Sequence, residues 1–101
     1  MSKEEIKQAI RKAVENDPHK KDILSVSLFG SYAYGTPNPD SDIDVLIEFE
    51  KGAVVGYFKL ARIQRHMRES VGKKIDLLTP QALSKYFREE VLNKAELIYG
   101  K

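Results

Sequence analysis

Apolar and polar positions near the N-terminus repeat every three or four residues, which predicts an amphipathic helix. The apolar positions of this repeat are Ile6, Ala9, Ile10, Ala13 and Val14. Ser2 and Glu5 have the spacing of a capping box, in which each side chain bonds to the backbone of the other residue at the start of a helix. Pro18 disfavours helical geometry in the residue before it, so we expect the helix to end near Asn16.

Four further segments have the composition or the two-residue alternation of strands. They cover residues 23–29, 42–49, 74–78 and 96–99. In the first of them we expect Leu24, Val26 and Leu28 to line one face. The last is expected at the edge of the sheet.

Two more helices are expected between these strands. An apolar stripe at helical spacing over about residues 57–70 is followed by Gly72, a residue that favours the end of a helix. Thr79 and Pro80 resemble a helix cap followed by proline at the first helical position. The residues expected to face inward from that helix are Leu83, Phe87 and Val91. The order of elements predicts an α+β fold, with a small mixed β-sheet flanked by helices.

The length and composition narrow the range of functions. A chain of 101 residues supports one domain, residues 1–101, that buries about two-thirds of its unfolded surface. A partner subunit, either a second copy in a homo-oligomer or a different chain, would therefore add stability. The net charge is +2, from 17 basic and 15 acidic residues interspersed along the chain. A basic surface for nucleic acid is not expected from this balance.

Cysteine is absent, which excludes a disulfide framework, a zinc–thiolate site and a cysteine nucleophile. No stretch approaches the roughly 18 apolar residues of a membrane-spanning helix. The N-terminus lacks the apolar segment of a signal peptide. We therefore expect a cytoplasmic protein with no membrane contact.

Asp42 and Asp44 bring two carboxylates to one face of the second predicted strand, because residues two apart on a strand point the same way. Their neighbours Ile43 and Val45 require the opposite face to be buried, which fixes the register. Two anions held together near a core raise a pKa or require a cation. A hard divalent cation such as Mg²⁺, which prefers oxygen ligands, meets this requirement. The alternative is that Asp42 is a turn residue, because residues 38–42 are rich in turn formers.

Asp76 repeats this pattern on the third predicted strand. It lies between Ile75 and Leu77, so it faces away from what these residues bury. If its strand neighbours the second one, three carboxylates gather as in a two-metal site. Such a site clamps the attacking and leaving oxygens of an in-line phosphoryl displacement. The alternative is a solvated aspartate at the end of a strand.

Gly30 and Ser31 come directly after the first predicted strand. Glycine allows a sharp turn and the close approach of a ligand. If Ser31 opens a short helix, its hydroxyl and the free backbone N–H groups form an anion site suited to triphosphate oxygens. The alternative is an ordinary strand-to-loop turn with a serine cap. The turn-rich connection over residues 32–41 lets neighbouring strands present these groups and the carboxylates at one end of the sheet.

Together these elements resemble a known family. The pattern of Gly30-Ser31, ten residues, and then Asp42-Ile43-Asp44 resembles the G-S-x10-D-x-D signature of the DNA polymerase β-like nucleotidyltransferase superfamily. The segment Lys74–Leu78 resembles the strand that carries the third carboxylate of that superfamily. The short chain resembles its minimal nucleotidyltransferases, the MNT proteins, which are commonly antitoxin partners of HEPN-domain toxins.

The resemblance implies a role for each matching position. Asp42 and Asp44 would ligate Mg²⁺, with two ions expected, and Asp76 would complete the metal site and help to deprotonate the attacking hydroxyl. Gly30 and Ser31 would bind the β- and γ-phosphates of ATP. The reaction implied is transfer of AMP to a hydroxyl, with a tyrosine of a HEPN ribonuclease toxin as the acceptor. The alternatives are an antitoxin that acts by binding alone and a stand-alone nucleotidyltransferase for a small molecule.

Basic residues are concentrated in and after the predicted helix at 57–70. They are Arg62, Arg65, His66, Arg68, Lys73 and Lys74. These side chains could neutralise a triphosphate or dock an acidic partner. We favour the simpler interpretation of a solvated helix face, with His66 on the surface.

Overall fold

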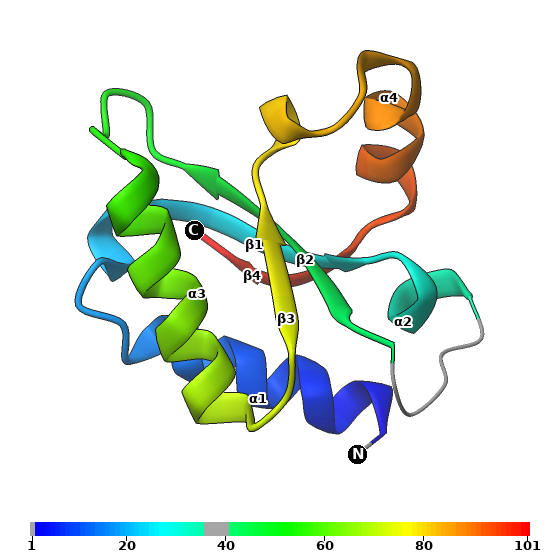
Figure 1. The fold of residues 1–101 in the computed structure, drawn as a ribbon, viewed down its shortest axis with the longest axis horizontal. Coiled ribbons are helices and arrows are strands. Elements are labelled where there is room, and N and C mark those ends of the chain that lie inside the picture. The colour runs from blue at the N-terminus through cyan, green and yellow to red at the C-terminus, as the bar shows by residue number, and fades with distance from the viewer. Residues whose placement is uncertain (1, 36–40) are drawn as a thin grey trace.

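The computed structural model describes residues 2–35 and 41–101 and has the predicted α+β architecture (Figure 1). Its main elements are α1 (Lys3–Glu15), β1 (Ile23–Phe29), α2 (Ser31–Tyr34), β2 (Ile43–Phe49), α3 (Tyr57–Val71), β3 (Ile75–Leu78), α4 (Lys85–Lys94) and β4 (Glu96–Gly100). Two short 3-10 helices precede β1 and α4, namely η1 (Lys20–Asp22) and η2 (Pro80–Ala82). The greater part of the predicted turn, residues 36–40, lies outside the described residues.

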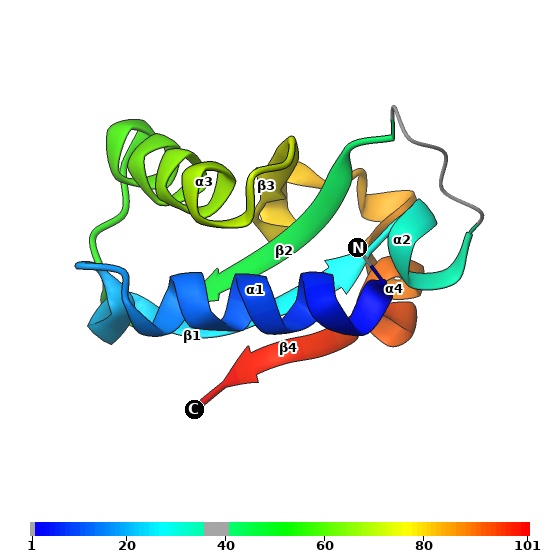
Figure 2. The same cartoon turned by 90° about the horizontal axis from the view of Figure 1, so that it is seen from below.

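The four strands form one mixed sheet in the order β3-β2-β1-β4. β1 is antiparallel to both β2 and β4, whereas β2 and β3 are parallel. Helices α1 and α3 pack side by side on one face of the sheet, and α4 lies on the other side (Figures 1 and 2). No helix within the described residues is long and apolar enough to cross a membrane.

The core lies between the sheet and the pair α1 and α3. Its most completely buried side chains are Ile6, Ile10, Val14, Ile23, Val26, Leu28, Ile43, Val45, Ile47, Ile63, Met67 and Ile75. Ile43, Val45 and Ile47 of β2 belong to this set, so the even-numbered residues of β2 point to the other face of the sheet. This arrangement places Asp44 on the face that α1 and α3 leave uncovered.

The predicted helix ends are confirmed for α1 and α3. Ser2 and Glu5 form the capping box at the start of α1, and Asn16 is its C-terminal cap. Gly72 ends α3 in the left-handed conformation, with φ of 75°. These signals are local, since each depends on residues within one turn of the helix end.

The expected inward position of Leu24 is wrong. Between Ile23 and Ser25 the β1–β2 pairing shifts, because two steps along β1 match one step along β2. Leu24 is therefore an additional residue in the ladder, and its side chain is exposed while Ile23 is buried. Such a bulge moves the following side chains to the opposite face from the one that strict alternation predicts.

The helix predicted to begin at Thr79–Pro80 is also wrong in its start and in its inward face. Pro80 opens only η2, and the Thr79 side chain makes no capping bond. Ser84 caps α4 instead, by accepting a hydrogen bond from the backbone of Tyr86. No residue of α4 is buried, and Phe87 is 60% exposed. Helix α4 therefore begins after Ser84 and not at Pro80. This later start changes the direction in which the apolar residues of α4 point, and they lie outside the core.

Candidate active site

The candidate site lies at one end of the sheet, where three strands meet. Because β1 and β2 are antiparallel, the end of β1 lies beside the start of β2, with Phe29 opposite Asp44. Because β2 and β3 are parallel, Asp44 also lies opposite Asp76. Asp42 immediately precedes β2, one residue outside the strand predicted to include it. The neighbouring strands that the carboxylate hypothesis requires are thus present.

Gly30 is in direct contact with Asp44. Its backbone has φ of 74° and ψ of −153°, a conformation that is essentially restricted to glycine. A Cβ atom at position 30 would overlap Oδ2 of Asp44 and would lie 3.0 Å from its Cγ. The missing side chain therefore makes room for the carboxylate beside the turn.

Ser31 opens the one-turn helix α2, which is the condition that the anion-site interpretation requires. The backbone N–H of Ala33 donates to the Gly30 carbonyl at 3.1 Å, and that of Gly35 donates to the Ser31 carbonyl at 2.9 Å. These bonds fix the turn that joins β1 to α2. The serine hydroxyl thus lies next to the glycine that contacts Asp44.

The charges of Asp76 and Asp42 act on Asp44. Burial raises the pKa of Asp44 above its usual value, and repulsion from Asp76 and then from Asp42 raises it further. Negative charge is therefore concentrated where desolvation makes it costly.

The donor set fits Mg²⁺, although the side chains are not yet gathered around one point. Within residues 2–35 and 41–101, no three acidic, histidine or cysteine side chains lie close enough together to hold a metal ion. Three carboxylates nevertheless supply the hard oxygen ligands that Mg²⁺ prefers, and this ion needs few ligands from the protein. A divalent cation would also remove the repulsion that raises the pKa of Asp44.

Arg68, one of the basic residues expected on a solvated face of α3, makes specific contacts at this site. Its Nε atom donates to the backbone carbonyl of Ile75 at 2.8 Å, and its Nη2 atom lies 3.7 Å from Oδ1 of Asp76. One turn earlier on α3, the Gln64 side chain accepts a hydrogen bond from the Leu77 backbone at 2.9 Å. Two side chains of α3 therefore bond to the outer edge of β3 and fix the strand that carries Asp76.

The expectation of a wholly solvated basic face on α3 is therefore wrong in part. Arg65 fits it, because this exposed side chain pairs with Glu69, one turn further along the helix. His66 does not, because its Nε2 atom lies 3.2 Å from the Ala13 carbonyl oxygen, where α1 and α3 meet.

Replacing Arg68 with Gln is expected to lower the free energy of unfolding by about 1 kcal/mol. The change removes a charged donor from a backbone carbonyl, although partial exposure reduces the worth of its ion pair with Asp76. Urea denaturation would measure the difference. Arg65→Gln is the matched control and should change the stability by less than about 0.5 kcal/mol. Equal losses in the two variants would show that the contact with β3 contributes nothing.

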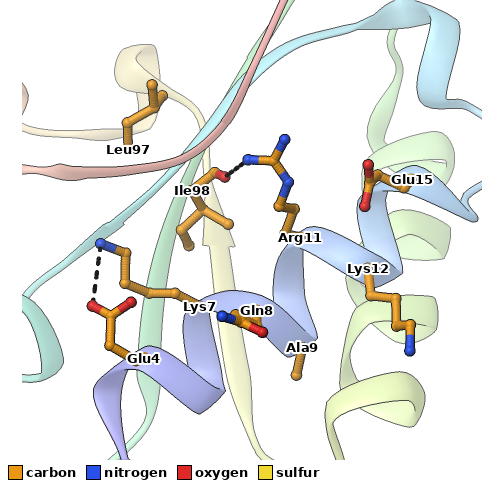
Figure 3. Close-up of a pocket in the computed structure, with 9 residues that line it drawn as sticks. All are labelled: Glu4, Lys7, Gln8, Ala9, Arg11, Lys12, Glu15, Leu97 and Ile98. Carbon is orange, nitrogen blue, oxygen red and sulfur yellow. Dashed lines mark hydrogen bonds and ion pairs between the residues drawn. The ribbon is translucent and has the colours of Figure 1, made fainter.

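A surface hollow of about 680 Å³ lies apart from this site, between α1 and β4 (Figure 3). Arg11 crosses it and donates to the backbone carbonyl of Ile98 at 3.2 Å. Lys7 and Glu4 form an ion pair on its wall at 4.0 Å. None of the three site carboxylates lines this hollow, so it is a separate feature of the surface.

A glycine–serine turn that faces carboxylates on two neighbouring parallel strands is the arrangement expected of a nucleotidyltransferase. A family model described as the nucleotidyltransferase domain matches residues 5–98. The chain therefore belongs to this family, and it is an enzyme of the nucleotidyltransferase class.

Relatives with names and structures agree with this assignment. A candidate protein adenylyltransferase of Methanocaldococcus jannaschii, MJ1379, is 30% identical over 95 residues, which cover 94% of each chain. The solved structure of a candidate minimal nucleotidyltransferase has a TM-score of 0.75 and 32% identity, over 94% of each chain. The predicted resemblance to minimal nucleotidyltransferases is thus confirmed.

A more distant solved structure shares the fold. It is the complex of a tri-AMPylated HEPN toxin with an MNT antitoxin from Shewanella oneidensis. The TM-score is 0.67 and the identity is 17%, over 98% of this chain and 73% of that one.

Proposed function

We propose that this protein is a Mg²⁺-dependent protein adenylyltransferase that transfers AMP from ATP to a tyrosine of a HEPN-type toxin and thereby acts as its antitoxin. The observation that supports the proposal is the pairing of Asp44 with Asp76 on neighbouring strands, with Asp42 directly before β2 and with Gly30 in contact with Asp44. The relative named as a candidate protein adenylyltransferase supports the reaction. The AMPylated HEPN complex of the distant structural relative supports the type of acceptor.

The residues divide into two groups in this mechanism. Asp42, Asp44 and Asp76 hold the metal ions. When bound, magnesium polarises the α-phosphate and stabilises the negative charge that develops on the attacking and leaving oxygens. Gly30 admits the phosphates close to the backbone, and the hydroxyl and N–H groups at Ser31 donate hydrogen bonds to the β- and γ-phosphates.

The chemical step is a displacement at the α-phosphorus. The acceptor hydroxyl oxygen forms a bond to this phosphorus, while the bond to the oxygen that bridges to the β-phosphate breaks and pyrophosphate leaves. Asp76 accepts the proton of the attacking hydroxyl, as a general base placed beside the reacting oxygen. The products are an AMP ester on the acceptor and pyrophosphate.

The open side of the sheet favours an acceptor that another protein brings. The described residues form one sheet and the helices around it. A docked protein would place its own tyrosine at the strand ends, on the side of the sheet that α1 and α3 leave uncovered.

Transfer of labelled AMP tests the proposal. The protein is incubated with ATP labelled on the α-phosphate, Mg²⁺ and the HEPN-type product of a neighbouring gene. We expect label on a tyrosine of that partner, located by mass spectrometry, and none with the variant Asp42→Ala/Asp44→Ala. Label transfer by the double variant would contradict the assignment of these residues.

Two other outcomes identify the alternatives. If the double variant neutralises the toxin fully with no nucleotide attached, the protein is an antitoxin that acts by binding alone. Turnover of a small acceptor such as an aminoglycoside without any second protein would identify a stand-alone enzyme.

A further inference from the structure

Lys3, at the start of α1, joins two segments that flank the Gly30–Ser31 turn. Its Nζ atom donates to the backbone carbonyl of Ala33, in α2, at 3.1 Å. The same atom forms an ion pair with Oε2 of Glu96 at 2.9 Å. One ammonium group therefore connects α1, α2 and the first residue of β4.

The position of Glu96 places this connection next to the turn. Glu96 lies opposite Leu28 in the β1–β4 ladder. Leu28 is two residues before Gly30 in the sequence. Ion pairs with Lys3 and Lys7 lower the pKa of Glu96, so its carboxylate stays charged at neutral pH. The first turn of α1 is itself fixed by the capping box at Ser2, which holds the backbone of Lys3 in place.

Helix α2 depends on contacts of this kind. A single turn of helix is not stable alone, because the free energy that helix nucleation costs exceeds what one or two hydrogen bonds contribute. On its inner side, Ala33 is buried in the core and Tyr32 packs against it. Lys3 bonds to its backbone at a carbonyl near the C-terminal end, where a cation is favoured.

We propose that Lys3 is a positioning residue that fixes the Gly30–Ser31 turn for the triphosphate of ATP. This role rests on the proposed function, which places the β- and γ-phosphates at Ser31. Lys3 acts through the Ala33 carbonyl and Glu96, and it touches neither the nucleotide nor the reacting atoms.

Lys7 provides a matched control for the alternative, in which Lys3 attracts ATP only through its charge. It lies one turn further along α1, and its Nζ atom lies 3.4 Å from Oε1 of the same Glu96. Its other ion pair among the described residues is with Glu4 (Figure 3). Replacing Lys7 with Met thus removes the same charge from the same carboxylate but leaves the bond to α2.

The experiment measures nucleotide binding and the mobility of α2 in the full chain. The affinity for ATP with Mg²⁺ is determined by calorimetry, and hydrogen exchange is followed at the Ala33 and Gly35 amides. Lys3→Met is expected to weaken ATP binding about three- to tenfold and to speed exchange at both amides. Lys7→Met should stay within about twofold of the parent chain, and Lys3→Arg, which keeps the charge and the donors, should restore most of the affinity.

Equal effects of Lys3→Met and Lys7→Met would overturn the proposal, because a long-range charge effect would then be sufficient. Unchanged exchange in Lys3→Met would overturn it as well. If the parent chain binds no ATP while Lys3→Met still speeds exchange, the proposed function fails and the mechanical link between Lys3 and α2 stands. Circular dichroism of each variant would identify a general loss of folding.

Discussion

Replacing Asp44 with Asn should abolish AMP transfer and, in the absence of metal, should make the protein more stable at neutral pH. Activity should fall at least about 100-fold, because a ligand of the proposed metal site is lost. The free energy of unfolding should rise by on the order of 1 kcal/mol. Burial and the charges of Asp76 and Asp42 make the ionised carboxylate unfavourable, and a neutral amide of the same shape removes this cost.

The stability gain should depend on pH in a defined direction. The folded-state pKa of Asp44 is raised above the ordinary value of 3.8, so between these two pKa values the folded protein binds more protons than the unfolded chain. Stability of the parent protein therefore falls as pH rises through this window. The advantage of Asp44→Asn should be absent below about pH 3.8 and complete above the folded-state pKa. Urea denaturation with a chelator at several pH values would measure it.

Asp22 provides a control, because the shift of its pKa has the opposite direction from that of Asp44. Its hydrogen bond from Lys59, at 3.0 Å, lowers its pKa. Its contribution to stability is present above the ordinary pKa and is lost as pH falls through the folded-state value. Asp22→Asn should therefore reduce stability at neutral pH and leave AMP transfer intact. A loss of stability in metal-free Asp44→Asn at neutral pH would instead show that the ionised Asp44 carboxylate does not destabilise the fold.

The parts of the fold that follow from local sequence were predictable, and those that depend on pairing were not. The capping box at Ser2 and the left-handed Gly72 are set by residues within one turn. The bulge at Leu24 depends on how β1 pairs with a strand that comes later in the chain. The start of α4 at Ser84 is an exception among the local features, because Thr79 and Ser84 are both possible caps and the side chain of Ser84 makes the capping bond.

The same distinction applies to the site. Gly30, Asp44 and Asp76 could be proposed from sequence, because Gly30 directly follows a predicted strand and the two aspartates alternate with apolar residues within predicted strands. The contacts that Arg68 and Lys3 make could not be predicted, since both side chains bond to backbone carbonyls, which leave no mark in the sequence. The contacts of Lys3 also join segments that are distant along the chain, so only the folded structure brings them together.

Gly30→Ala should have the largest effect on stability, because it combines backbone strain with a direct clash. The backbone of Gly30 lies in a region where alanine costs about 1–3 kcal/mol, and the added methyl group would overlap the Asp44 carboxylate. Relief of that overlap costs about 1–3 kcal/mol more. We expect a loss of about 3 kcal/mol or more, measured by urea denaturation.

Gly72→Ala is the control that separates the effect of the clash with Asp44 from the effect of a positive φ. Gly72 has φ of 75°, close to the 74° of Gly30, but a Cβ there would meet no atom within 4 Å. Its left-handed conformation costs alanine about 1–2 kcal/mol. AMP transfer, measured at a temperature where both variants are folded, should be retained in Gly72→Ala and lost in Gly30→Ala, because only the second displaces Asp44. Equal stability and equal activity in the two variants would mean that the approach of Asp44 to the Gly30 backbone has no role in the site.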